Sequence, residues 1–308
     1  MSAVRKIFIF FLQITSSLNY FKFYFWSYGC KMKNQINLFK DKKNKEKITI
    51  LTAYDYSLAK ILSSTAIDAI LIGDSLGMVF QGKDSTLSVT LDEMVYHCKA
   101  VRKGAPDAFL IADMPFLSFH VSVEETIRNA GRLIKEGDVN AVKLEGGREI
   151  MDKITGLLAA KIPVMGHLGL TPQSINIFGG YKIQAKSYDN ARQIIEDAVL
   201  LEKNGVFAIV LEGIPERIAE IITGKLNITT IGIGAGRYVD GQVLVINDIL
   251  GIYDKIVPKF VKTFSHVGDE MKKGINEFIN DVKNGQFPEQ KHTYAVNDEI
   301  IKKIENEY

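Results

Sequence analysis

The sequence predicts an α/β protein, a (β/α)8 TIM barrel with a C-terminal helical extension, and three observations predict it. Eight short runs rich in β-branched residues follow residue 48, and they are apolar at successive positions. Continuous apolarity indicates strands buried on both faces, as in a parallel sheet. Longer amphipathic segments alternate with these runs, and the whole alternation spans roughly 200 residues, which suits a single barrel.

The predicted strands are the apolar runs, and the predicted helices are the amphipathic segments between them. The runs are ITILTAYD (48–55), AILIGD (69–74), FLIAD (109–113), AVKLE (141–145), PVMGH (163–167), AIVLE (208–212), TTIGIG (229–234) and QVLVIND (242–248). In the helical segments apolar residues recur at three and four positions. These segments are 56–64, 91–103, 123–136, 148–160, 191–204 and 214–223.

Helix starts agree with this division. Thr90 and Ser122 each stand before a helical segment with an acidic residue three positions on, Glu93 and Glu125, which is the pattern of an N-terminal cap. A doubly wound sheet is the competing fold, but it calls for a glycine-rich phosphate turn after the first strand. The first run leads into YSLAK without a glycine, and GIGAG (232–236) lacks GxGxxG spacing, so no dinucleotide site is expected.

Charge is distributed unevenly along the 308 residues. The 38 Lys and Arg nearly balance the 36 Asp and Glu, but residues 1–47 hold ten basic and two acidic side chains, which leaves the rest of the chain acidic. A nucleic-acid partner is therefore not expected. The apolar run 7–12 is far shorter than the roughly 20 residues of a membrane span. Cys30 and Cys98 give no metal spacing or disulfide framework, so a cytoplasmic protein is expected.

The composition predicts three parts. Residues 1–34 form a basic, aromatic leader that we interpret as unstructured or not native, because Met32 opens a stretch typical of a translation start; a transit peptide is the alternative. Residues 35–262 form the catalytic barrel. Residues 263–308 form a charged extension with helical patterns at 267–283 and 298–307.

Ionisable residues end most of the predicted strands. In a barrel the C-terminal strand ends meet at one mouth, where active sites lie. Three consecutive strands lead to Asp74, Asp113 and Glu145, and carboxylates buried together must share a cation, share protons or face water. Without paired histidines or thiolates, these ligands suit Mg²⁺ or a similar divalent ion. A helix cap or a surface ion pair is the alternative for any one of them.

Other strand residues are candidates for the chemistry of catalysis. Lys143 lies two residues before Glu145, so it points the same way and could neutralise a substrate carboxylate or form an interior salt bridge. Glu212 ends an apolar run and suits proton abstraction. His167 ends the fifth run and could bind substrate. Alternatively, it could be a packing residue, or donate a hydrogen bond to a residue that itself contacts substrate. The loop FGGYK (178–182) could act as a lid.

Long ordered motifs resemble the ketopantoate hydroxymethyltransferase family over about residues 35–262. They are TAYDYSLAK (52–60), GDSLGMVFQGKDSTL (73–87), ADMPF (112–116), KLEGG (143–147), GHLGLTPQSINIFGGYK (166–182), VLEGIP (210–215) and IGIGAGRYVDGQVLV (231–245). The resemblance implies a (β/α)8 barrel, a homodecamer, and transfer of a one-carbon unit from 5,10-methylenetetrahydrofolate to 3-methyl-2-oxobutanoate, giving 2-dehydropantoate. The leader and the last fifty residues inherit no role from it.

The resemblance also implies residue roles. Asp74, Asp113 and Glu145 would form the Mg²⁺ site, Glu212 would be the base, and the residues contacting the keto acid would be Asp74, Ser75, Asp113 and Lys143. Mg²⁺ would polarise the keto group and make the C3 proton acidic. The rival enzyme reading is an Mg²⁺-dependent carbon–carbon lyase or phosphonomutase of the phosphoenolpyruvate mutase/isocitrate lyase type, which calls for a nucleophile or lyase cysteine loop that the sequence lacks. A barrel that binds a keto acid or serves as an assembly subunit without catalysis is a further alternative. Such a protein would not need all the carboxylates at the mouth, and all of them are present.

Overall fold

The computed structural model describes residues 36–253 and 258–308, so the predicted leader and Cys30 lie outside the described residues. The chain divides into two compact units between Val245 and Ile246. The first unit contains the barrel and the second contains the C-terminal helices, and each is described by itself. The domain bounds set by the sequence, 35–262 and 263–308, stay a prediction.

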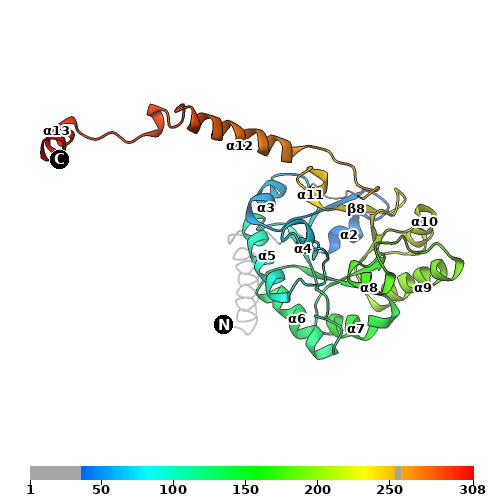
Figure 1. The fold of residues 1–308 in the computed structure, drawn as a ribbon. Helices are drawn as coiled ribbons and strands as arrows, with labels where there is room; N and C mark the ends of the chain where they lie inside the picture. The colour runs from blue at the N-terminus through cyan, green and yellow to red at the C-terminus, as the bar shows by residue number, and fades with distance from the viewer. Residues whose placement is uncertain (1–35, 254–257) are drawn as a thin grey trace, which may run out of the picture. The chain divides into compact units, whose positions relative to one another are not determined.

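Eight parallel strands close into one barrel in sequence order, with β1 paired to β8, and this confirms the predicted fold (Figure 1). The strands are β1 (Ile48–Thr52), β2 (Ala69–Ile72), β3 (Phe109–Asp113), β4 (Ala141–Glu145), β5 (Val164–Gly169), β6 (Ala208–Glu212), β7 (Thr229–Ile233) and β8 (Gly241–Leu244). β2 to β4 and β6 are nearly continuous in burial, as expected for strands covered on both faces.

The predicted second and seventh strands extend one or two residues past the ends of β2 and β7, and the first and last predicted strands extend three and four residues too far. β1 ends at Thr52, and Asp55 caps the following helix, because its Oδ1 accepts a hydrogen bond from the backbone N of Leu58 at 2.9 Å. β8 ends at Leu244, and Asp248 lies in helix α11 (Ile246–Ile249). Asn and Asp are disfavoured in strands, and an acidic residue is stabilising in the first turn of a helix.

The predicted helices are confirmed to within a few residues at their ends. They are α3 (Tyr56–Ser63), α5 (Leu91–Gly104), α6 (Val123–Lys135), α7 (Met151–Ala159, preceded by the 3₁₀ turn Arg148–Ile150), α9 (Tyr188–Asn204) and α10 (Glu216–Lys225). Both predicted caps are present: the Thr90 hydroxyl accepts from the backbone N of Glu93 within a full capping box, and Ser122 accepts from that of Glu125. Four short helices were not predicted, α2 (Asn37–Lys42), α4 (Leu76–Val79), α8 (Ile175–Phe178) and α11.

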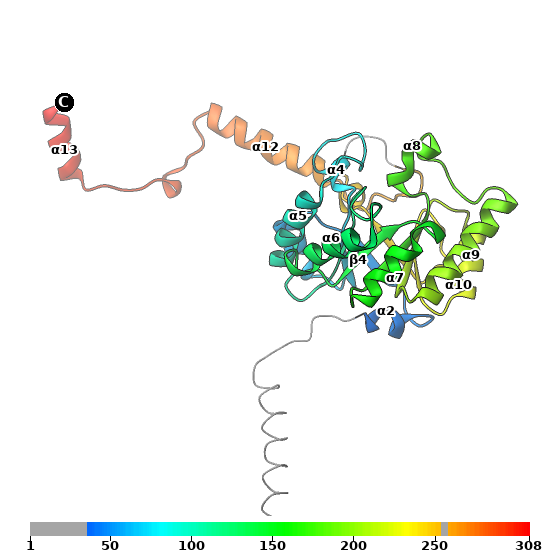
Figure 2. The same ribbon diagram turned by 90° about the horizontal axis from the view of Figure 1, so that it is seen from below.

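The interior of the barrel is an apolar core closed by α2. Phe39 of α2 is fully buried, and its ring centroid lies 5.5 Å from that of Phe109 and 5.0 Å from that of Phe207. The core residues are Phe39, Ile48, Ile50, Ala69, Leu71, Phe109, Ile111, Ala141, Met165, Ala208, Val210, Ile231 and Val243. Figure 2 places α2 at the end of the barrel opposite α4 and α8, so the strand N-termini are sealed.

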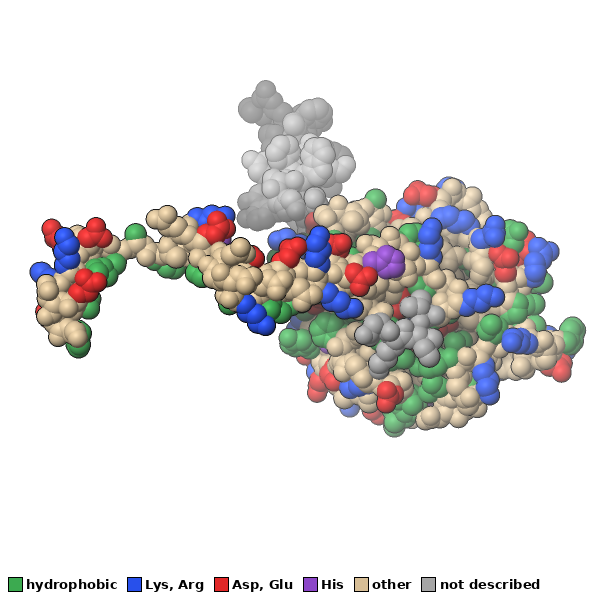
Figure 3. Space-filling view, turned by 45° about the horizontal axis from the view of Figure 1, so that its top comes forward, with side chains coloured by type: hydrophobic (Ala, Val, Ile, Leu, Met, Phe, Trp, Pro, Cys, Tyr) green, Lys and Arg blue, Asp and Glu red, His purple; other side chains and the backbone are tan. Residues whose placement is uncertain are grey.

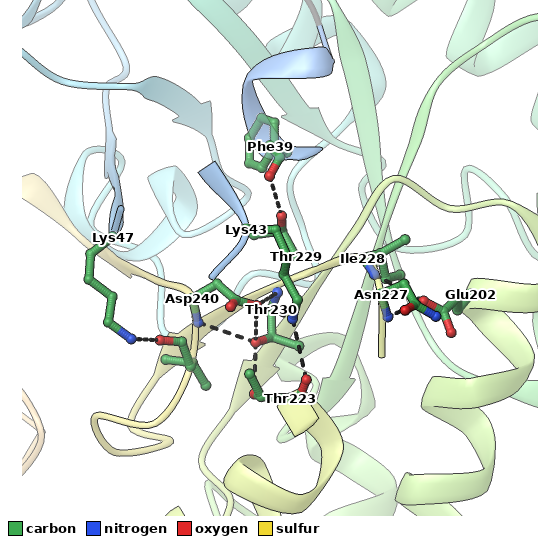
Figure 4. A network of polar contacts seen from close by, with 11 residues as sticks. Phe39, Lys43, Lys47, Glu202, Thr223, Asn227, Ile228, Thr229, Thr230 and Asp240 are labelled. Carbon is green, nitrogen blue, oxygen red and sulfur yellow. Dashed lines mark hydrogen bonds and ion pairs between the residues drawn. The ribbon is translucent and has the colours of Figure 1, made fainter. Parts of the chain in front are cut away.

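Buried polar contacts hold α2 against the last two strands (Figure 4). Lys43 Nζ lies 2.7 Å from Asp240 Oδ2, with both side chains buried, and the same oxygen accepts from the backbone N and the Oγ1 of Thr230 at 2.8 and 2.9 Å. Thr229 Oγ1 donates to the backbone O of Phe39 at 2.7 Å. These contacts stabilise the fold and take no part in the chemistry, because this end of a barrel is remote from the mouth.

The second unit is helical. It contains α11, α12 (Val267–Lys283), a 3₁₀ turn (Gln290–His292) and α13 (Asp298–Glu307), and α12 and α13 have the predicted bounds. Exposed apolar residues of α12 recur at three and four positions and so share one face: Met271, Ile275, Phe278 and Val282.

The described surface is mixed in charge on the face drawn in Figure 3, where Lys, Arg, Asp and Glu side chains are interspersed. This face shows no continuous basic stripe of the kind that nucleic-acid-binding proteins present. Within residues 36–253 and 258–308, none of the helices combines the length and apolarity that crossing a membrane requires.

Candidate active site

The barrel core gives way to ionisable side chains toward the C-terminal ends of the strands. Asp113, His167 and Glu212 each follow a residue of the barrel core by two positions, and Lys143 and Glu145 continue the same face of β4. Alternate residues of a strand share a face, so these five side chains are directed inward. The strand register sets Asp113 beside Lys143 and Glu145 beside His167. The structure thus brings together residues from four strands that the sequence singled out.

Asp74 and Ser75 follow β2 and lie beside these side chains. The backbone N of Asp74 donates to Asp113 Oδ2 at 3.1 Å, and the Asp74 side chain is almost fully buried. Ser75 Oγ lies 2.9 Å from Tyr54 Oη, a buried side chain that the sequence did not single out. Tyr54 therefore fixes the position of a residue expected to contact the keto acid.

Lys143 is a buried ammonium among carboxylates. Its Nζ lies 3.0 Å from Asp113 Oδ1 and 3.1 Å from His167 Nδ1. Burial alone would lower the pKa of Lys143, but the charges of Asp113, Glu145 and Asp74 outweigh burial and raise it. The interior salt bridge considered from the sequence is present, and substrate contact by the same ammonium stays a prediction.

The carboxylates carry more negative charge than Lys143 balances. Burial raises the pKa of Asp74 well above its usual range, and the neighbouring charges of Asp113 and Glu145 raise it further. Burial also raises the pKa of Glu145 to about 7, although Lys143 opposes the shift. Three carboxylates against one ammonium leave a surplus that protons or a divalent cation can offset.

Gln173 joins two of these carboxylates, and sequence reasoning missed it. Its Nε2 donates to Asp74 Oδ2 at 2.8 Å and to the backbone O of Met114 at 2.9 Å, and its backbone N donates to Glu145 Oε2 at 2.9 Å. The side chain is buried in the 3₁₀ turn Pro172–Ser174 after β5. The only available signal was its place in the motif GHLGLTPQ, because a glutamine in a loop does not by itself indicate a site.

His167 connects Lys143 to Glu212. Its Nδ1 lies 3.1 Å from Lys143 Nζ and 3.5 Å from Glu145 Oε1, and its Nε2 lies 3.2 Å from Glu212 Oε2. Burial and the charge of Lys143 lower the pKa of His167, which favours a neutral imidazole. The Glu212 side chain keeps 15% of its surface exposed, more than the other carboxylates of the cluster, so it is accessible to a substrate.

The donor chemistry of the cluster fits a hard divalent cation. Asp74, Asp113 and Glu145 offer carboxylate oxygens, which Mg²⁺ prefers, and their surplus charge is of the right sign. Within the described residues, however, no group of three His, Cys, Asp or Glu side chains is already arranged to hold a metal. Binding would therefore need side-chain movement, starting with the Asp113 carboxylate that Lys143 now holds.

The predicted lid loop reaches α4. Tyr181 Oη, in FGGYK, donates to Met78 Sδ at 3.3 Å, and the loop backbone has positive φ at Gly179 and Gly180. Such glycines permit the chain to turn sharply between α8 and α9. Movement of this loop stays a prediction.

A closed (β/α)8 barrel with buried acids, an ammonium and a histidine at its mouth defines a barrel enzyme. The family model for ketopantoate hydroxymethyltransferase matches residues 33–290, and the chain belongs to this family. A 3-methyl-2-oxobutanoate hydroxymethyltransferase of Clostridium beijerinckii is 56% identical over 274 residues, which are 89% of this chain and all of the relative. A 3-methyl-2-oxobutanoate hydroxymethyltransferase of Clostridioides difficile is 54% identical over 274 residues, again 89% of this chain and all of the relative.

The sequence underestimated how far this likeness extends. The family match runs to residue 290, so it includes α12, and the expectation that the likeness ends near residue 262 was wrong. The C-terminal segment is charged and lacks strand-end motifs, so there was little by which to recognise it.

Solved structures share the fold at low identity. A phosphonopyruvate hydrolase complexed with oxalate and Mg²⁺ has a TM-score of 0.56 and 12% identity, covering 88% of this chain and 95% of that one. A 2,3-dimethylmalate lyase of the phosphoenolpyruvate mutase/isocitrate lyase superfamily has a TM-score of 0.54 and 14% identity, covering 84% and 90%. These likenesses show the barrel fold. The family is shown by the much closer sequence relatives.

Proposed function

We propose that the chain transfers a hydroxymethyl group to 3-methyl-2-oxobutanoate, with 5,10-methylenetetrahydrofolate and water as co-substrates and 2-dehydropantoate and tetrahydrofolate as products. The observation that carries the proposal is one mouth that holds Lys143, Glu212 and the three carboxylates. The chain that forms this mouth is 56% identical to a hydroxymethyltransferase over 89% of its own length. The lyase or phosphonomutase alternative rests on the fold alone.

Residues at the mouth have complementary roles in this proposal. Asp74, Asp113 and Glu145 hold Mg²⁺, which when bound supplies positive charge that polarises the keto group. The Lys143 ammonium has three N–H donors, of which two have partners in the described structure, and it attracts the substrate carboxylate. Ser75, held by Tyr54, contacts the same keto acid.

Glu212 performs the proton transfer. Its carboxylate removes the proton from C3 of the keto acid, and the electron pair of that bond moves toward the keto oxygen as an enolate. C3 then attacks the methylene carbon of the folate, which breaks one of the two bonds from that carbon to folate nitrogens. The second of these bonds is replaced by one to the hydroxyl oxygen of water, and the other proton of that water goes to the nitrogen that leaves. The proton that Glu212 accepted leaves with solvent or the departing folate. A cytoplasmic homodecamer is part of the same proposal, and the mass of the purified assembly tests its size.

An assay of the purified full chain tests the function. We expect 2-dehydropantoate from 3-methyl-2-oxobutanoate and 5,10-methylenetetrahydrofolate in Mg²⁺, no product after chelation, and recovery when Mg²⁺ is returned. Exchange of the C3 hydrogen with D₂O, without folate, isolates the proton transfer. Cleavage of 2,3-dimethylmalate or phosphonopyruvate, with no folate-dependent product, would favour the lyase or phosphonomutase alternative.

A further inference from the structure

His167 lies between an obligatory donor and an obligatory acceptor. Nδ1 faces Lys143 Nζ at 3.1 Å and Nε2 faces Glu212 Oε2 at 3.2 Å. The imidazole is buried, and it is directed inward from β5 between the neighbouring strands β4 and β6. Its two nitrogens therefore have different partners.

These partners determine where the imidazole proton resides. A lysine ammonium has donors and no lone pair, so Nδ1 must accept from Lys143. A neutral imidazole has one acceptor and one donor nitrogen, which leaves the proton on Nε2, facing a carboxylate that can only accept. Glu145 Oε1 would favour the opposite tautomer, but it lies farther from Nδ1, at 3.5 Å. The nearer ammonium decides between them.

The geometry points to His167 as a positioning residue. Lys143 fixes the Nε2–H tautomer of His167, and this Nε2–H donates to Glu212 and aims the Glu212 carboxylate at the substrate. This inference rests on the proposed role of Glu212 as the base. In the described structure Nε2 is buried and makes no hydrogen bond, although Glu212 Oε2 lies 3.2 Å away. Catalytic hydrogen bonds commonly tighten when substrate binds.

The tautomer can be measured on the full chain without any turnover. In protein labelled with ¹⁵N-histidine, NMR should show His167 with a protonated Nε2 and an unprotonated Nδ1, and the His167→Asn variant identifies its signals. Lys143→Met removes the ammonium, so we expect the Nδ1–H form to become populated. An Nδ1–H tautomer in the unaltered protein, or no change in Lys143→Met, would overturn the inference.

Two substitutions separate positioning from mere filling of space. In His167→Gln the side-chain amide N lies about as far from the backbone as Nε2 does in histidine, so it can replace the donor to Glu212. In His167→Asn the amide N lies only about as far out as Nδ1. A hydrogen bond to a charged group corresponds to about 10- to 100-fold in rate, so His167→Asn should lose that much C3 hydrogen exchange. His167→Gln should retain most of the exchange, and keto-acid affinity should be unchanged in both variants.

The outcomes distinguish this inference from the proposed function. Equal losses of exchange in the Asn and Gln variants, or a loss of keto-acid affinity alone, would contradict positioning of Glu212 by His167. Absence of exchange in the unaltered protein would instead contradict the role of Glu212 as the base. The NMR measurement still reports the tautomer in that case.

Discussion

Gly169 pairs with Glu212 between β5 and β6, and the backbone carbonyl of Glu212 leaves no room for a side chain at Gly169. A β-carbon added to Gly169 would overlap that oxygen, and it would also meet the Ile214 side chain at 2.8 Å. Gly169 has a φ of +102°, a conformation that other residues rarely adopt, and the next residue, Leu170, donates its backbone N to the same oxygen at 2.8 Å. The end of β5 thereby sets the position of the proposed base.

Gly169→Ala should therefore impair catalysis through the backbone. The added methyl group must displace Glu212 or strain β5, so we expect C3 hydrogen exchange to fall by about tenfold or more and stability to fall by about 1–3 kcal/mol. Gly131→Ala in α6 is the matched control, since a β-carbon there meets nothing within 4 Å. It should leave exchange unchanged and raise stability slightly. Equal behaviour of the two variants would contradict this account.

Glu212→Gln tests the base directly. The amide keeps the size of the side chain but cannot accept the C3 proton, so exchange in D₂O should fall by at least about a hundredfold. Binding of the keto acid, followed by calorimetry, should persist. Glu124→Gln, at an exposed position of α6, is the control and should exchange normally. Undiminished exchange in Glu212→Gln would exclude it as the base.

The sequence predicted the barrel because local patterns determine it. β3, β4 and β6 have the predicted bounds, since each is an apolar run with a polar residue at its end. Helices α4 and α8 were missed because four residues are too few to display a helical repeat.

The site was predictable only where strand order determines it. Asp113, Lys143 and Glu145 end adjacent strands, so a parallel barrel must bring them together. Gln173 and Asp74 are 99 residues apart, and no local pattern signals that an amide in a loop bonds to a distant carboxylate. The contact between His167 and Glu212 likewise depends on side-chain direction across two strands.

Stability should depend on pH through the buried acids. Burial raises the pKa of Glu145 to about 7, above its unfolded value of about 4.5. The folded state therefore binds this proton more tightly than the unfolded state does. The resulting stabilisation is complete below about pH 4.5 and is lost as the pH rises through about 7. Without Mg²⁺, the midpoint of thermal unfolding should fall over this range by more than it does in Glu145→Gln.

Mg²⁺ should reverse this trend. Protons compete with the cation for the same oxygens, so the increase in unfolding midpoint on adding Mg²⁺ should be larger at about pH 8 than at about pH 5.5. Ca²⁺ is a useful comparison, because it accepts similar oxygen ligands in a looser geometry. An effect of Mg²⁺ that is independent of pH, or that persists undiminished in Asp74→Asn, would place the cation elsewhere.

Gln173 should act on binding more than on proton transfer. Gln173→Leu leaves Asp74 Oδ2 and the backbone O of Met114 without its amide, at a cost of about 1–3 kcal/mol in stability. We expect KM for the keto acid to rise severalfold, because Asp74 is no longer held. Gln173→Glu keeps the shape but sets a fourth carboxylate beside Asp74, so it should impair binding further unless the Mg²⁺ concentration is raised. Kinetics of both variants equal to those of the unaltered protein would exclude this role.

Lys43 and Asp240 should govern stability without affecting catalysis. Lys43→Met leaves the buried Asp240 carboxylate with only its Thr230 donors, and removing one member of a buried ion pair typically costs about 3–5 kcal/mol. Lys47→Met is the control, because the Lys47 ammonium donates to the backbone O of Val239 and forms no ion pair among the described residues. Its loss should cost about 1 kcal/mol or less. Adding Asp240→Asn to Lys43→Met removes the stranded charge, so the double variant should recover part of the loss in chemical denaturation. This pair lies at the N-terminal ends of the strands, away from the mouth, so kcat and KM of the folded variants should match those of the unaltered protein. A lower kcat in a variant that is fully folded would contradict this and show that the two ends of the barrel are coupled.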